Sequence, residues 1–188
     1  MEILVIGSVA LDSVETPFGQ KDGILGGSAT YFSTAASYFA AVKLVAVVGE
    51  DFPDEHRQFL SERNIDLSGL QTRSGETFRW KGRYGYDLNE AHTLETHLNV
   101  FESFHPEVPD EAQKSPFVFL ANIDPELQLE VLKQVDKPRL IACDTMNFWI
   151  DGKREALIRT LAHVDILIIN EAEVRQLADE PNLVKAAR

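Results

Sequence analysis

The sequence predicts an α/β fold in which a mostly parallel sheet is covered by helices. Five short apolar runs recur along the chain, at residues 3–6, 44–48, 117–121, 140–143 and 166–169. Each run has the length and composition of a strand buried on both faces. Helical patterns lie between several of the runs, and strands that alternate with helices form parallel sheets.

Two segments between these runs have the three- or four-residue spacing of amphipathic helices. The first contains Ala29, Phe32, Ala36 and Phe39, and the second contains Leu127, Val131, Leu132 and Val135. Asp124 stands directly before Pro125. Asp can cap the free N–H groups of a helix, and the missing N–H of proline costs nothing at the first helical position. We therefore expect helices to begin near Ser28 and at Pro125.

Residues 77–100 follow a period of two, which is typical of an antiparallel hairpin with two different faces. The first half alternates Phe78, Trp80, Tyr84 and Tyr86 with Arg79, Lys81, Arg83 and Asp87, and the second half alternates Leu94, Thr96, Leu98 and Val100. We interpret the hairpin as a small lid that leaves the parallel sheet within a single domain of residues 1–188. The three basic residues could bind a phosphorylated substrate or form a solvated edge.

Residues 182–188 begin another helical pattern, which stops after about two turns without a capping glycine or a following strand. Isolated helices shorter than ~12 residues are marginally stable. A frayed terminal helix and a chain cut inside an element both explain this end, and we expect the cut.

The composition excludes several classes of function. The net charge of −12 opposes binding to phosphate backbones, so no nucleic-acid partner is expected. No stretch approaches the roughly 18 apolar residues of a membrane span, and the N-terminal run lacks the basic start of a secretory signal. Cys143 is the only cysteine, and its apolar surroundings predict a buried, inert thiol. These features favour a cytoplasmic protein without a membrane partner.

Polar residues follow every apolar run, at the edge of an open parallel sheet where ligands usually bind. The sets span residues 7–12, 49–51, 122–124, 144–147 and 170–173, and each contains Asp, Asn or Glu. Any one set is explained by solvent exposure at a strand end. The convergence of all five on one edge favours a binding site.

Common cofactor motifs are absent. Residues 7–12 lack the second and third glycines of a dinucleotide loop, and no Gly-Lys-Ser/Thr sequence forms a P-loop. His92 and His97 are five residues apart, which does not fit a zinc pair on a helix or on one face of a strand. Gly26 and Gly27 precede a predicted helix, where close backbone approach and unpaired N–H groups suit a ligand oxygen. A flexible turn explains this pair equally well.

Together these motifs resemble the ribokinase-like (PfkB) family of carbohydrate kinases over the whole chain. The resemblance rests on residues 7–12 after the first run, Gly26–Gly27 before a helix, Val-Ala-Val-Val-Gly-Glu-Asp at 45–51, the hairpin lid, and the Asn-x-x-Glu motif formed by Asn170 and Glu173. It implies a ribokinase-like three-layer fold with a mostly parallel central sheet and a small antiparallel β lid. It also implies transfer of the terminal phosphoryl group of ATP to a hydroxyl of a sugar or related alcohol.

The resemblance assigns roles to individual residues. Asp12 would accept hydrogen bonds from substrate hydroxyls, and Gly26 and Gly27 would let the sugar lie against the backbone. Asn170 and Glu173 would orient the phosphates and a hydrated Mg²⁺, which Glu173 would hold through water. The rim of the substrate pocket would comprise Asn122, Asp144 and Asn147, and the water-excluding lid face would comprise Phe78, Trp80, Tyr84 and Tyr86. A half-buried sheet face or a dimer contact would also account for these aromatic residues. Lid-mediated dimers occur among family members, so the resemblance also suggests a homodimer.

The sequence departs from the family in two places. Tyr31 stands where many members have Asn, so the identity of the sugar stays open. The family's Gly-Ala-Gly-Asp motif, which supplies the general base and an anion hole, is absent, and the last glycine is Gly152. Losing an oxyanion donor costs about 10²- to 10³-fold in rate, and losing general-base catalysis costs about 10²- to 10⁴-fold. We therefore expect no catalytic residue in this chain, an incomplete domain whose C-terminal part is missing, and little activity of its own.

The first hypothesis for function is the substrate-side, N-terminal portion of an ATP-dependent carbohydrate kinase. The alternatives are a nucleoside kinase of the same fold and a non-catalytic α/β module that binds a small molecule. The sequence identifies neither the substrate nor the oligomeric state.

Overall fold

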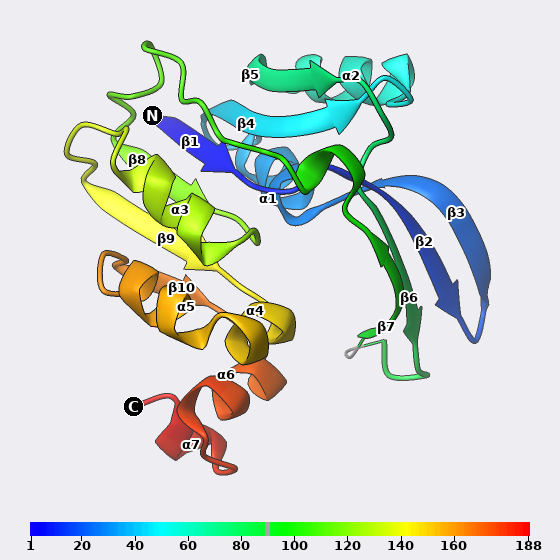
Figure 1. The fold of residues 1–188 in the computed structure, drawn as a ribbon, viewed down its shortest axis with the longest axis vertical. Helices are drawn as coiled ribbons and strands as arrows, with labels where there is room; N and C mark the ends of the chain where they lie inside the picture. Colours follow the sequence, from blue (N-terminus) through cyan, green and yellow to red (C-terminus); the bar gives the residue numbers. More distant parts are fainter. Residues whose placement is uncertain (89–90) are drawn as a thin grey trace.

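The computed structural model describes residues 1–88 and 91–188 and contains two sheets (Figure 1). The larger sheet has six strands in the order β10-β9-β8-β1-β4-β5, and all five neighbouring pairs are parallel. These strands are β1 (Glu2–Ile6), β4 (Ala41–Gly49), β5 (Ile65–Arg73), β8 (Phe117–Leu120), β9 (Leu140–Asp144) and β10 (Ile166–Ile168). The five predicted runs correspond to β1, β4, β8, β9 and β10, whereas β5 was not predicted.

Helices cover both faces of this sheet. They are α1 (Ser28–Ala36), α2 (Asp54–Ser61), α3 (Pro125–Leu132), α4 (Asn147–Gly152), α5 (Arg154–Leu161), α6 (Glu171–Ala178) and α7 (Leu183–Ala186), with a 3-10 turn η1 (Asn99–Phe101). Successive residues of β1 point to opposite faces. Leu4 packs in the core that includes η1 and α3, and Val5 packs in the core that includes α1 and α2. The predicted three-layer fold with a parallel central sheet is confirmed.

The interpretation of every run as a strand buried on both faces is wrong at one edge of the sheet. Val5 and Leu44, in central strands, are fully buried, but Ile166 and Ile168 of β10 are 45% and 53% exposed. The physical reason is position, because β10 is an edge strand and, among the described strands, pairs only with β9.

The predicted helix starts at Ser28 and Pro125 are both confirmed. The Asp124 carboxylate accepts a hydrogen bond from the backbone N–H of Glu126 at 3.0 Å, as expected of a helix cap. Helix α1 ends at Ala36, so Phe39 lies beyond the helix to which its spacing assigned it and is 83% exposed. No helix within residues 1–88 or 91–188 is long and apolar enough to cross a bilayer.

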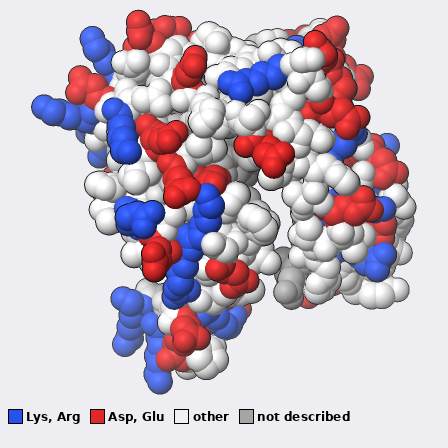
Figure 2. Space-filling view, viewed as in Figure 1, with Lys and Arg blue, Asp and Glu red and all other residues white. Residues whose placement is uncertain are grey.

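The second sheet forms the lid and has four strands in the order β3-β2-β6-β7. They are β2 (Ala10–Thr16), β3 (Gly19–Gly26), β6 (Arg79–Tyr84) and β7 (Ala91–His97). The predicted hairpin corresponds to the antiparallel pair β6–β7, with residues 89 and 90 outside the described residues. An antiparallel β2–β3 hairpin joins it through a parallel β2–β6 pair, so the lid is mixed and larger than predicted. Figures 1 and 2 show the lid projecting from the main body, with an open gap between them.

The base of the lid is held by Asp51, just after β4. Its carboxylate accepts hydrogen bonds from the N–H and the hydroxyl of Thr77, both at 2.6 Å, and pairs with Arg79 at 2.6 Å. The Thr77 hydroxyl in turn accepts from the N–H of Gly49 at 3.0 Å. Burial raises the pKa of Asp51, but the bonds from Thr77 and Arg79 outweigh it and lower the pKa overall. The end of β4 is thereby fastened to the start of β6.

The basic residues of β6 point away from the inner face of the lid. Arg79 pairs with Asp51, while Lys81 and Arg83 both pair with Glu15 of β2, at 3.3 and 2.8 Å. Their charges are therefore matched by the carboxylates of Glu15 in the lid and Asp51 at its base, which favours the solvated-surface interpretation over binding of a phosphorylated substrate.

Candidate functional site

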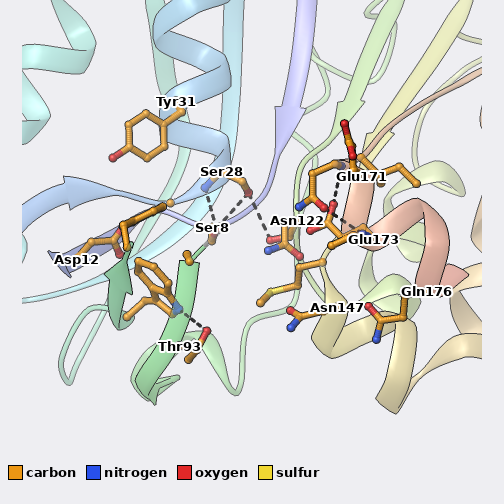
Figure 3. A pocket seen from close by; sticks show the side chains of 18 of the residues that line it. Ser8, Asp12, Ser28, Tyr31, Thr93, Asn122, Asn147, Glu171, Glu173 and Gln176 are labelled. Carbon is orange, nitrogen blue, oxygen red and sulfur yellow. Dashed lines mark hydrogen bonds between the residues drawn. The ribbon is translucent and has the colours of Figure 1, made fainter. Parts of the chain in front are cut away.

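A cleft of about 1030 Å³ lies between the carboxyl edge of the main sheet and the inner face of the lid (Figure 3). Five predicted site residues with polar side chains line it: Asp12, Asn122, Asn147, Asn170 and Glu173. Asp144 borders an adjoining cavity of about 530 Å³ together with Asn170 and Glu173. The expected convergence holds for four of the five strand-end sets. The set at 49–51 does not join them, because Asp51 turns to Thr77 at the base of the lid.

Asp12 is a buried carboxylate on the lid side of the cleft. It lies in β2 beside an irregularity in the β2–β3 pairing, and it is 8% exposed. Burial raises its pKa to about 6, although a hydrogen bond from the backbone N–H of Gly27 lowers it in part. A Cβ at Gly26 would overlap the carboxylate, so a glycine is needed behind Asp12. Gly26 thus makes room for Asp12, and only Gly27 of the pair lines the cleft.

Gly27 precedes α1 with a φ of 92°, a conformation that favours glycine. A Cβ there would overlap the carbonyl oxygen of Ser8. We expected unpaired N–H groups at this helix start to donate to a ligand. That expectation is wrong for the N–H groups of Gly27, Ser28 and Ala29, which have partners within the protein. Gly27 donates to Asp12, while Ser28 and Ala29 both donate to Ser8, at 3.1 Å each. Gly27 therefore allows close approach of the backbone and holds Asp12 through its N–H, while the N–H groups of Ser28 and Ala29 hold Ser8.

Asn122 and Asn147 lie on the sheet side of the cleft. Asn122 follows β8, and its side-chain oxygen accepts a hydrogen bond from the indole of Trp149 at 2.9 Å. Asn147 begins α4, and its side-chain oxygen accepts from the backbone N–H of Phe148 at 3.0 Å. Figure 3 shows both side chains facing Asp12 across the cleft.

Asn170 and Glu173 form a reciprocal cap at the start of α6. The Asn170 side chain accepts from the N–H of Glu173 at 3.0 Å, and the Glu173 carboxylate accepts from the N–H of Asn170 at 2.9 Å. The Asn-x-x-Glu motif therefore also has a structural explanation as a capping box. Burial raises the pKa of Glu173, and the bonds from Asn170 lower it in part.

Asp144, at the end of β9, carries the most perturbed carboxylate of the site. Burial, and then the nearby charge of Glu173, raise its pKa to about 7, while the backbone N–H of Asn122 lowers it in part. Its buried Oδ1 has no hydrogen-bond partner among the described residues. Mg²⁺ is usually bound through one or two carboxylates plus waters and phosphates, so this donor pair fits a hydrated ion. No group of three or more candidate ligand side chains gathers anywhere in residues 1–88 and 91–188.

Aromatic side chains form the lid wall of the cleft. Phe78, Trp80 and Tyr84 line it, whereas Tyr86 lies beyond β6, is 83% exposed and packs edge-on against Phe18. The indole of Trp80 donates to the Thr93 hydroxyl at 3.1 Å, and its ring covers Gly82, where a Cβ would overlap it. The orientation of this ring is therefore fixed from two sides.

Several lining residues were not singled out from the sequence, among them Ser8, Ser28, Thr93, Met146 and Gln176. Tyr31 was noted only as a departure from the family, yet it borders both cavities. Burial, and then the neighbouring Asp12 and Tyr84, raise the pKa of its hydroxyl. Gln176 lies three residues after Glu173 on α6, so helical spacing from the Asn-x-x-Glu motif could have found it.

Comparison with known proteins adds three findings. The sequence model of the pfkB carbohydrate kinase family matches residues 11–188. A cytidine kinase of Thermococcus kodakarensis is 28% identical over 191 residues, which cover 100% of this chain and 68% of that protein.

Two solved structures share the fold and cover 95% of this chain each. The nucleoside kinase of Methanocaldococcus jannaschii has a TM-score of 0.72 at 20% identity. The nucleoside kinase of Burkholderia thailandensis in complex with inosine has a TM-score of 0.77 at 14% identity. This chain spans 63% of the length of both.

Proposed function

Because the chain belongs to the pfkB family of carbohydrate kinases, we propose that it binds a nucleoside and presents a hydroxyl of its sugar for ATP-dependent phosphorylation. The proposal adopts the nucleoside alternative in place of a free sugar. The observation that carries it is the aromatic lid wall, in which Trp80 is held by Thr93 and Gly82 with its ring bordering the cleft.

The size of the cleft also supports a ligand larger than a monosaccharide. Its volume of about 1030 Å³ lies just above the range of roughly 300–1,000 Å³ that is typical of sites for drug-sized ligands. Aromatic side chains bind nucleobases by stacking, which contributes about 1–3 kcal/mol per base. A cytidine kinase among the relatives and an inosine complex among the similar structures point in the same direction.

The polar residues then have different roles in binding. Asp12, whose pKa of about 6 leaves it ionised at neutral pH, accepts hydrogen bonds from sugar hydroxyls. Gly27 lets the sugar lie against the backbone, and Asn122 and Asn147 border it. Asp144 and Glu173 would hold hydrated Mg²⁺, which when bound neutralises phosphate charge. The 188 residues contain no Gly-Ala-Gly-Asp sequence, so we assign no general base and expect no turnover by this chain alone.

A free sugar is the second candidate. It is favoured because Asp12 and the backbone at Gly27 need only the hydroxyl groups of a ligand as partners, and a sugar without a base supplies these. Calorimetric titration with cytidine, inosine and ribose separates the two. We expect both nucleosides to bind at least 10-fold more tightly than ribose. Equal affinities would favour the sugar, and binding of neither nucleosides nor ribose would contradict the proposed function.

Two matched pairs of variants assign the binding to the cleft. Asp12→Asn should remove nucleoside binding, while Asp22→Asn, in the exposed part of β3, should leave it unchanged. Trp80→Ala should weaken nucleoside binding by about 5- to 150-fold, the equivalent of one stacked base. Tyr86→Ala, an aromatic residue of the lid outside the cleft, is its control. Nucleoside binding that is unaffected by Trp80→Ala would contradict the stacking role.

A further inference from the structure

The backbone N–H, the backbone carbonyl and the side-chain oxygen of Asn122 all form hydrogen bonds within the protein. Its backbone N–H donates to the Asp144 carboxylate, and its backbone carbonyl accepts from the Ser28 hydroxyl at 3.5 Å (Figure 3). Its side-chain Oδ1 accepts from Nε1 of Trp149 at 2.9 Å. Within the described parts of the chain, no hydrogen bond is formed by the side-chain Nδ2 group. Asn122 therefore enters the cleft with two unused N–H donors.

The contact with Trp149 decides which way this amide points. An indole N–H can only donate, so its partner must be an acceptor, and the oxygen of the amide must face Trp149. The Nδ2 group of the planar amide then occupies the other side. Asn122 borders the cleft, whereas Trp149 is not among the described residues that line it. The two N–H donors of the Asn122 amide consequently face the cleft, and its oxygen faces Trp149.

Trp149 is itself well anchored. It lies in α4, where its backbone N–H donates to the carbonyl of Met146 at 3.0 Å and its carbonyl accepts from Lys153 at 2.9 Å. The Phe148 ring packs edge-on against it at a centroid distance of 4.8 Å. Trp149 does not line the cleft itself, and its indole can act on a ligand through the Asn122 amide that it contacts.

We propose that Trp149 is a positioning residue that orients the Asn122 amide so that its two N–H donors face the cleft. Asp12, on the opposite side, presents a carboxylate that only accepts when ionised. The cleft thus offers hydrogen-bond donors at Asn122 and an acceptor at Asp12. As a refinement of the proposed function, on which this step rests, the nucleoside must place an acceptor oxygen or ring nitrogen at Asn122 while its sugar hydroxyls donate to Asp12.

The orientation can be tested without a ligand. In ¹⁵N-labelled protein, the indole proton of Trp149 should exchange slowly with solvent, and Asn122→Ala should accelerate that exchange at least 10-fold. Ser28→Ala, which removes a contact with the backbone carbonyl of Asn122 and leaves its side-chain amide in place, should not. Unchanged indole exchange in Asn122→Ala would overturn the proposal.

A second test measures the affinity for cytidine in a double-mutant cycle of Trp149 and Asn122. Trp149→Phe and Asn122→Ala should each weaken affinity by about 3- to 10-fold, the equivalent of one hydrogen bond. The double variant should be no weaker than Asn122→Ala alone, because Trp149 acts through that amide. Losses that multiply would overturn the positioning role and leave the proposed function standing. If the unaltered protein binds no nucleoside, the proposed function fails, and the indole exchange still decides whether Trp149 holds Asn122.

Discussion

Replacing Asp12 by Asn should stabilise the protein at neutral pH even though it removes substrate binding. Burial raises the pKa of this carboxyl group from its usual 3.8 to about 6, and the residue is only 8% exposed. The folded protein therefore favours the neutral acid, whereas the unfolded chain ionises at the usual pKa. Ionised Asp12 thus opposes folding.

The sign and size of the effect follow from proton linkage. For an acid whose pKa is raised by folding, the penalty is absent below the unfolded pKa, grows between the two pKa values, and is constant above the folded one. A difference of about 2 between the two pKa values corresponds to about 3 kcal/mol. Asn keeps an oxygen for the N–H of Gly27 but carries no charge. The free energy of unfolding should rise by up to about 3 kcal/mol at pH 8 and by little at pH 4.

Urea denaturation followed by circular dichroism at pH 4, 6 and 8 measures this difference. Asp22→Asn is the matched control, because Asp22 is exposed and a hydrogen bond from Gln20 lowers its pKa, so no gain is expected. An Asp12→Asn protein that is no more stable at pH 8, or equally stabilised at pH 4 and pH 8, would refute the argument from burial.

Three other outcomes follow from the same geometry. Gly27→Ala demands a φ near 92° and places a Cβ against Ser8, so thermal denaturation should show a loss of about 2 kcal/mol or more. Asp51→Asn weakens the contacts with Thr77, so backbone hydrogen exchange should accelerate in the lid strands but not in β1; uniform acceleration would contradict a role of Asp51 confined to fastening the lid. Mg²⁺ affinity, measured by NMR titration, should increase as the pH rises through about 7, because the ion requires an ionised carboxylate, and Asp144→Asn should abolish that dependence.

The central strands could be predicted from the sequence because a strand covered on both faces must be apolar throughout. The same reasoning fails for strands that lack a continuous apolar run and form because they pair with a neighbouring strand. Residues 19–23 of β3 are exposed, and β5 mixes buried Leu70 with exposed Asp66 around Gly69. β3 is held by its hairpin partner β2, and β5 by β4, from which α2 separates it in the sequence. One local signal was available for the lid, the Pro17–Gly19 turn between two strand-length segments.

The strand-end rule found much of the site because parallel strands bring their carboxyl ends to one edge. It could not separate Asp12, which faces the cleft, from Asp51, which follows its strand in the same way but holds the lid. It could not find Trp149, whose contact with Asn122 joins positions 27 residues apart. Which way a side chain turns at a strand end is decided by tertiary partners, and these are not encoded in local spacing.

Three carboxyl groups at this edge of the molecule, those of Asp12, Asp144 and Glu173, have pKa values raised mainly by burial. No Lys or Arg within the described residues forms an ion pair with them, so their ionised forms oppose folding at neutral pH. Buried acids without cationic partners destabilise the fold, and such groups are typical of sites that bind a ligand. Sugar hydroxyls can compensate Asp12, and a hydrated cation can compensate the other two. The destabilisation is therefore what binding relieves, and because the pKa values of Asp12 and Asp144 are about 6 and 7, that relief is greatest above neutral pH.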